Sequence, residues 1–190
     1  MKKYNISFLT VLITLSFILI DGTLYSLYAV LFSFLHEIAH ISALKLVGGR
    51  VKGLHTGAVG VGLDTTCLSY TGEAVVAIAG PLMSLFLFFC FLPFCAKSPI
   101  LFFCCFSNLI IFILNILPVY PLDGGRVLYC LLCKKLSLST AVKITKSVSF
   151  LFLLPLLFIS VIILINTGYN VSLLVISIYL LSVLVGVKNL

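Results

Sequence analysis

Long apolar runs recur along this sequence, and they constrain its fold more than any other feature. Short segments that hold turn residues and most of the charged residues separate them. A helix rises about 1.5 Å per residue, so about 20 apolar residues cross the hydrocarbon layer of a bilayer. The runs therefore predict an all-α membrane protein with six spans. We place them at about residues 4–20, 24–47, 73–94, 100–133 (broken in its middle), 147–165 and 169–187.

Composition excludes a soluble protein. Of the 190 residues, 62% are apolar and 9% are charged, whereas a soluble domain carries about a quarter charged residues. Six spans leave no room for a soluble domain, so we expect a single membrane domain over residues 1–190. The first run lacks a small-x-small cleavage site before Asp21, which favours a retained span over a cleaved signal peptide.

The net charge of +7 does not indicate nucleic-acid binding, because the basic residues stand in the gaps between apolar runs. Such gaps lie at the anionic cytoplasmic leaflet. With both termini placed in the cytoplasm, only Lys97 falls on the outer side. The sequence therefore predicts a multi-pass protein of the cell membrane with cytoplasmic N- and C-termini. The basic residues placed on the cytoplasmic side are Lys2, Lys3, Arg50, Lys52, Lys134, Lys135, Lys143, Lys146 and Lys188.

Residues 48–72 have a different texture from the apolar runs. Two glycines open the segment, and Gly60 and Gly62 then alternate with valine and leucine. A period of two predicts extended strands. The segment is too short and too polar to cross a membrane, so we expect a short re-entrant β-hairpin.

The run at 100–133 cannot be one continuous helix. Pro118 and Pro121 stand in its middle, followed by Asp123, Gly124 and Gly125. Proline removes a helical hydrogen bond and clashes with the preceding turn. Irregular backbone at membrane depth persists only where protein covers it or where it lines a watery cavity. The break therefore marks a candidate site.

The second run contains His36-Glu37-Ile38-Ala39-His40. Residues four apart share one face of a helix, so both histidines can bind one Zn²⁺ while Glu37 acts as general base for the attacking water. Ionisable groups inside an apolar helix are costly and mark function by default. The alternative is that they are structural polar residues that hold helices together.

A zinc protease needs a third protein ligand, and the chain has five acidic residues. Asp123 is the candidate, because it lies in the broken middle of its span, at the depth expected for His36 and His40. An aspartate here can also cap the helix that follows it. Both roles are compatible.

These residues resemble the site-2 protease family of intramembrane metalloproteases. The resemblance rests on the His36–His40 motif together with residues 115–126, NILPVYPLDGGR. The six-span layout most resembles the sporulation factor IVFB branch, without that branch's C-terminal regulatory domain. The resemblance implies one zinc ion held by His36, His40 and Asp123, with Glu37 as base.

The resemblance also implies contacts to substrate. It implies that Asn115 holds or polarises the substrate strand. It suggests that the 48–72 hairpin, with Gly60 and Gly62, pairs with an unwound substrate segment. Residues 79–84 resemble a family segment in which Asn often stands where this chain has Ser84, and we assign no contact to this serine.

Together these features predict a zinc metalloendopeptidase that cleaves membrane-embedded or membrane-tethered protein segments. Its partners are then a membrane protein substrate and the bilayer, not nucleic acid. The alternative is a metal transporter or zinc-sensing membrane protein without proteolytic activity, since broken helices also build transport sites. Two features count against this alternative: there is no second broken helix, and Glu37 would have no role.

Overall fold

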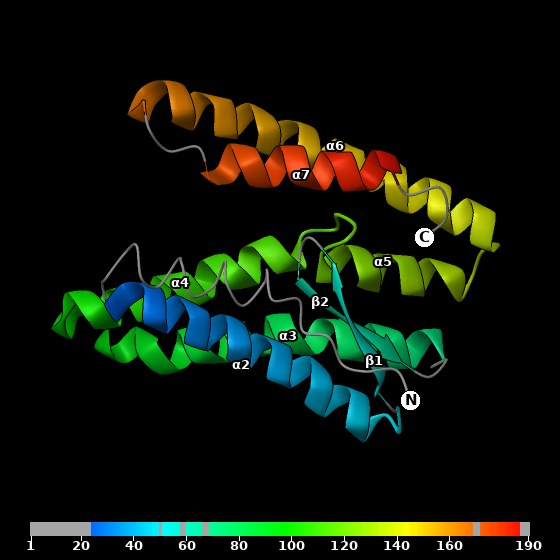
Figure 1. Ribbon diagram of the computed structural model, residues 1–190, viewed down its shortest axis with the longest axis horizontal. Helices are drawn as coiled ribbons and strands as arrows, with labels where there is room; N and C mark the ends of the chain where they lie inside the picture. Colours follow the sequence, from blue (N-terminus) through cyan, green and yellow to red (C-terminus); the bar gives the residue numbers. More distant parts are fainter. Residues whose placement is uncertain (1–23, 50, 58–59, 66–68, 169–171, 187–190) are drawn as a thin grey trace.

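The structure is a computed structural model that describes residues 24–49, 51–57, 60–65, 69–168 and 172–186. The predicted first span, residues 4–20, lies outside these residues. The described chain is nearly all helical (Figure 1). Its elements are α2 (Leu24–Leu46), β1 (Val51–Gly57), β2 (Gly60–Thr65), α3 (Tyr70–Phe91), the 3₁₀ helix η1 (Leu92–Lys97), α4 (Pro99–Ile116), α5 (Asp123–Cys133), α6 (Leu138–Thr167) and α7 (Ser172–Gly186).

Helix α3 is the centre of the helical assembly. It packs against α2, α4 and α5, whereas α6 packs mainly against α7 and reaches the other helices through α5. Figure 1 shows α6 and α7 as an antiparallel pair on one side of the remaining helices. The chain therefore consists of a four-helix group around α3 and a helical hairpin beside it.

Four helices among the described residues are long and apolar enough to cross a membrane, and α7 is apolar but shorter. Large apolar side chains such as Phe34, Phe86 and Phe158 are exposed on the outer faces of these helices. Lipid chains solvate such apolar faces, whereas their exposure to water is unfavourable. The helices indicate a multi-pass membrane protein, and the count of six spans stays a prediction. The candidate spans are Tyr25–Leu46, Tyr70–Lys97, Pro99–Ile116 and Leu138–Thr167.

Serine caps set where two of the helices begin. The Ser69 side chain accepts from the Gly72 amide at 3.1 Å, so α3 starts before residue 73. Ser98 caps α4 in the same way, accepting from the Leu101 amide at 3.2 Å, and Pro99 occupies the first turn. Side-chain oxygens at this position satisfy amides that have no partner within the helix. Proline fits the first turn because the missing amide would be unpaired there.

The fourth apolar run contains two helices instead of one. Helix α4 ends at Ile116, and Leu117, the residue before Pro118, has an extended backbone with ψ of 136°. Proline disfavours the helical conformation of the residue before it. Helix α5 then starts at Asp123. Figure 1 shows α4 and α5 running roughly end to end, with residues 117–122 between them.

The irregular segment 117–122 is partly buried, and Val119 is its most buried residue. Val119 is fully buried and packs in an apolar cluster with Leu153 of α6 and with Leu180 and Leu184 of α7. The peptide bond before Pro121 is cis. The segment thus joins the α6–α7 pair to the four-helix group.

Ser149 of α6 satisfies the backbone of this segment. Its fully buried hydroxyl accepts from the Tyr120 amide at 2.9 Å and donates to the Pro118 carbonyl at 3.4 Å. Unpaired backbone groups at membrane depth cost several kcal/mol each. A single serine therefore supplies two of the hydrogen bonds that the broken helix forgoes.

Two glycines let this segment fold back onto α5. A Cβ at Gly124 would collide with the carbonyl oxygen of Ile116, and one at Gly125 would collide with the backbone of Val119 and Tyr120. Only glycine permits so close a backbone approach. The glycine pair therefore fixes where Asp123 stands relative to the end of α4.

Helix α6 is longer than the span predicted at 147–165. Its N-cap is Ser137, and it continues to Thr167, with Gly168 as C-cap. The sequence reading stopped at the lysines before residue 147. Lys143 and Lys146 lie within the helix instead, where long side chains can carry their charge away from the apolar face.

Strands β1 and β2 form a two-stranded antiparallel sheet. Gly57 pairs with Gly60 and His55 pairs with Gly62, and the register shifts between Val51 and Gly53. Whether this pair of strands enters the membrane, as expected from the sequence, stays a prediction.

Candidate metal centre

Helix α2 turns its two histidines inward. His36 and His40 are each 5% exposed, whereas their neighbours Phe34 and Ile38 are exposed. Residues 36 and 40 lie one turn apart on the same face. The two histidines thus lie on the buried face of this apolar helix, which is the arrangement expected of functional groups within a membrane.

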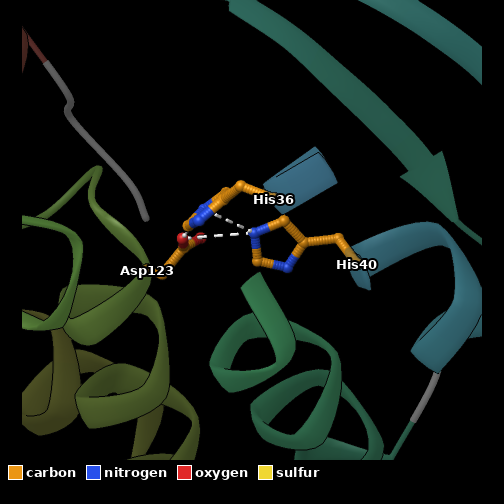
Figure 2. Close-up of side chains that lie close together, drawn as sticks. All are labelled: His36, His40 and Asp123. Carbon is orange, nitrogen blue, oxygen red and sulfur yellow. Dashed lines mark hydrogen bonds and ion pairs between the residues drawn. The ribbon is translucent and has the colours of Figure 1, made fainter. Parts of the chain in front are cut away.

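Asp123, the first residue of α5, completes a group of three (Figure 2). Its Oδ2 lies 3.1 Å from Nε2 of His36 and 3.2 Å from Nε2 of His40. The two Nε2 atoms lie 3.2 Å apart. One carboxylate oxygen and two imidazole nitrogens therefore form a nearly equilateral triangle.

The size of this triangle fits a zinc ion. Zinc binds histidine nitrogen and carboxylate oxygen at about 2.0–2.2 Å in tetrahedral geometry, which puts neighbouring ligand atoms roughly 3.3 Å apart. The three separations of 3.1, 3.2 and 3.2 Å are close to that edge length. The group can therefore form one face of a tetrahedron and leave the fourth position open.

The hydrogen bonding of His40 supports the same conclusion. Its Nδ1 lies 2.7 Å from the carbonyl oxygen of Val76, which can only accept, so Nδ1 donates. The neutral ring then presents a lone pair at Nε2, towards the Asp123 carboxylate. Lone pairs that converge on one point attract a cation.

Helix α3 lines the other side of the site. Ser84, which is 1% exposed, places its Oγ 3.0 Å from Nδ1 of His36. A Cβ at Gly80 would collide with Nε2 of both His36 and His40. The absence of a side chain at Gly80 therefore makes room for the two imidazoles.

The Ser84 contact was not expected from the sequence. Comparison with a family position that often carries Asn gave no reason to place a serine against His36. The sequence does place Val76, Gly80 and Ser84 on one face of α3, because they recur every four residues, but it does not say which helix that face meets.

Asp123 does not cap α5. The N-cap position is Leu122, and it carries no side-chain capping bond. The carboxylate instead reaches the histidines through Oδ2, while Oδ1 lies 3.7 Å from Nη1 of Arg126. The capping interpretation of Asp123 was therefore wrong, because helix α5 begins one residue earlier than a cap at this position requires.

The other predicted site residues lie outside this triangle. Glu37 follows His36 on α2, and its side chain is exposed on the surface of the helices. Asn115, in the last turn of α4, donates its amide to the carbonyl oxygen of Ile111 at 3.0 Å. Gly60 and Gly62 lie on β2. The base and substrate roles of these residues stay predictions.

Comparison with known proteins identifies similar proteins and a solved structure with the same fold. Residues 92–156 match the family model of peptidase family M50. A zinc metalloprotease of Methanocaldococcus jannaschii is 30% identical over 166 residues, covering 78% of this chain and 48% of that protein. Stage IV sporulation protein FB of Bacillus subtilis is 31% identical over 134 residues, covering 64% of this chain and 45% of that protein. The chain thus spans about half the length of these relatives.

The solved structure of a site-2 protease from Methanocaldococcus jannaschii has the same fold. It superposes with a TM-score of 0.66, covering 90% of this chain and 82% of that one, at 21% sequence identity.

Proposed function

We propose that the chain is an intramembrane zinc metalloendopeptidase of peptidase family M50, because residues 92–156 match that family, a zinc metalloprotease is 30% identical to the chain and a solved site-2 protease has the same fold. Its substrates are membrane-embedded or membrane-tethered protein segments. The family implies zinc, and His36, His40 and Asp123 form a possible metal site. We assign these three residues as the ligands of one zinc ion per chain.

The observation that carries the proposal is the triangle of Nε2, Nε2 and Oδ2 atoms. Its ligand types and its separations of 3.1–3.2 Å suit zinc with one open coordination position. An open position distinguishes catalytic zinc from structural zinc, which is closed by four protein ligands.

When bound, the ion supplies Lewis-acid activation of the attacking water and the substrate carbonyl. Glu37 then takes the proton from that water and returns it to the leaving amide nitrogen. Its place one residue after His36 puts it about 100° round the helix from the first ligand. We assign Glu37 as the catalytic base.

Substrate has to be extended to be cut, because an intact helix hides its carbonyl groups in hydrogen bonds. A two-stranded sheet offers backbone groups to a third strand along its edges. We propose that the β1–β2 pair holds the substrate in this way, with Gly60 and Gly62 allowing close approach. Asn115 would hold or polarise the same strand.

We further propose the cell membrane as the site of action, with both termini of the chain in the cytoplasm. The asymmetry of the basic residues supports this orientation. All the proposed catalytic and substrate-binding residues belong to one membrane domain over residues 1–190.

Substitution of Glu37 by Gln tests the proposal. Glu37→Gln should still bind zinc, because the three ligands are unchanged, but it should lose cleavage by about 10²–10⁴-fold, the usual contribution of a general base. Glu73→Gln is the matched control, since Glu73 is the other glutamate of the chain and contacts Cys130 instead. Zinc content is measured by mass spectrometry, and substrates are sought as membrane proteins whose uncut forms accumulate.

The alternative function gives a different result. A transporter or a zinc sensor would bind zinc in both variants and leave the membrane proteome of Glu37→Gln identical to that of the wild type. That outcome would remove the proposal of proteolysis while keeping the metal site.

A further inference from the structure

We infer that Ser84 is a positioning residue for the metal site, and that it orients His36 by accepting the hydrogen of its Nδ1. The inference rests on the proposed function, because it concerns how this chain prepares two of the proposed ligands.

Helix α3 contacts both histidines and gives each of them one hydrogen-bond acceptor. Val76, Gly80 and Ser84 recur every four residues on α3, and α2 runs antiparallel to it, so Ser84 meets His36 while Val76 meets His40. The two acceptors are eight residues apart, about 12 Å along the helix. The histidines are four residues apart, about 6 Å.

This difference in spacing sets the directions of the rings. We call Val76, Gly80 and Ser84 the stripe on α3. Each Nδ1 atom points to an acceptor at one end of this stripe, so the two Nε2 atoms point to its middle and lie 3.2 Å apart. Gly80 lies halfway along the stripe, where a Cβ would collide with both Nε2 atoms. The convergence of the ligand atoms is therefore a consequence of where α3 places its two acceptors.

The two acceptors differ in whether a substitution can remove them. The Val76 carbonyl is part of the backbone, so no substitution at residue 76 removes it. The acceptor for His36 is a single buried hydroxyl at 3.0 Å. When a cation occupies Nε2, Nδ1 has to carry the hydrogen, and Ser84 is the group placed to accept it. Such partners of metal-bound histidines typically change metal affinity by about 10–100-fold.

The test measures zinc affinity of the full chain, purified in detergent, by competition with a coloured chelator. Ser84→Ala should weaken zinc binding by about 10–100-fold. Ser84→Thr, which keeps the hydroxyl, should restore most of the affinity. Ser160→Ala is the matched control, since Ser160 is also fully buried but bonds the Leu157 carbonyl of its own helix at 2.6 Å.

A second readout separates positioning from general stability. In protein whose histidines are labelled with nitrogen-15, the Nδ1–H resonance of His36 should shift in Ser84→Ala. The Nδ1–H resonance of His40 should not shift, because its hydrogen bond to the Val76 carbonyl is unchanged. Ser84→Cys keeps the size of the side chain and weakens the acceptor, so it replaces Ser84→Ala in both measurements if the alanine variant does not fold.

The outcomes are distinct. Equal zinc affinity in wild type and Ser84→Ala, or an equal loss in Ser160→Ala, would overturn the positioning role and leave the metal site intact. A folded Ser84→Thr protein with the low affinity of Ser84→Ala would overturn it as well. A wild-type chain that binds no zinc would overturn the proposed function together with this inference.

Discussion

Nε2 of His36 and Oδ2 of Asp123 lie 3.1 Å apart although 87 positions separate the two residues in the sequence. Helix α2 carries the histidine, α5 carries the aspartate, and α3 packs against both. The site therefore exists only when three helices are assembled. A bound cation would link α2 directly to α5.

Removal of zinc should lower the stability of the protein. A ligand that binds only the folded state stabilises it by about 2.7 kcal/mol when present at one hundred times its dissociation constant. A chelator should therefore lower the thermal unfolding midpoint of the wild type in detergent. Asp123→Asn, which loses the charged ligand, should unfold at the same temperature with and without chelator. A wild-type midpoint that ignores both zinc and chelator would count against a metal that bridges α2 and α5.

Gly80→Ala should prevent zinc binding. The added Cβ collides with Nε2 of both His36 and His40, so at least one ring has to leave the triangle, and overpacking of this kind costs about 1–3 kcal/mol. Gly186→Ala in α7 is the control, because a Cβ there has no atom within 4 Å. Zinc content of the two purified variants is the measurement. Full zinc occupancy in Gly80→Ala would show that the rings do not lie against α3.

Ser149→Ala should destabilise residues 117–122. It leaves the Tyr120 amide of this partly buried segment without its acceptor at 2.9 Å, and a fully buried group left unpaired costs about 1–3 kcal/mol, which sets the upper bound here. Ser160→Ala on the same helix removes an equally buried hydroxyl, which donates to the Leu157 carbonyl of its own helix. Thermal unfolding of both variants, with hydrogen exchange at Val119 and Tyr120, measures the difference. Equal effects of the two changes would contradict the role of Ser149.

Arg126→Ala should change zinc affinity little. Its Nη1 lies 3.7 Å from Oδ1 of Asp123, but the side chain is 47% exposed, and exposed ion pairs are worth about 0–1 kcal/mol. The affinity should therefore fall by about fivefold at most, less than in Ser84→Ala. The same chelator competition ranks the two variants. A larger loss in Arg126→Ala would show that this arginine fixes the carboxylate.

Local pattern was sufficient to predict which three residues lie together in the candidate metal site, but not the residues that support them. The spacing of His36 and His40 is a property of one helix, and the interruption before Asp123 follows from proline and glycine chemistry within a short segment. The contacts of Ser84 and Val76 depend on which face of α3 meets α2. That register is a tertiary property, which no local pattern contains.

Some helix ends could likewise be predicted from the local sequence, and others could not. Pro118 predicts the end of α4, since proline acts on its immediate neighbours. The early start of α6 at Leu138 depends on the Ser137 cap. The sequence prediction began this helix only after Lys143 and Lys146, because lysines were taken to lie outside the apolar span. Asp123 resembled a cap by residue type, yet Leu122 holds that position. Residue preference alone could not distinguish a carboxylate that turns back to its own helix from one that turns towards α2.

The stripe on α3 also has a consequence for the order in which the protein is made. Both imidazoles and all three α3 positions that contact them belong to residues 36–84, which are synthesised before Asp123. A chain that has not yet reached residue 123 contains both histidines and the α3 residues beside them, but not the carboxylate. The candidate metal site can therefore be complete only after α5, the last of its three helices, has been made.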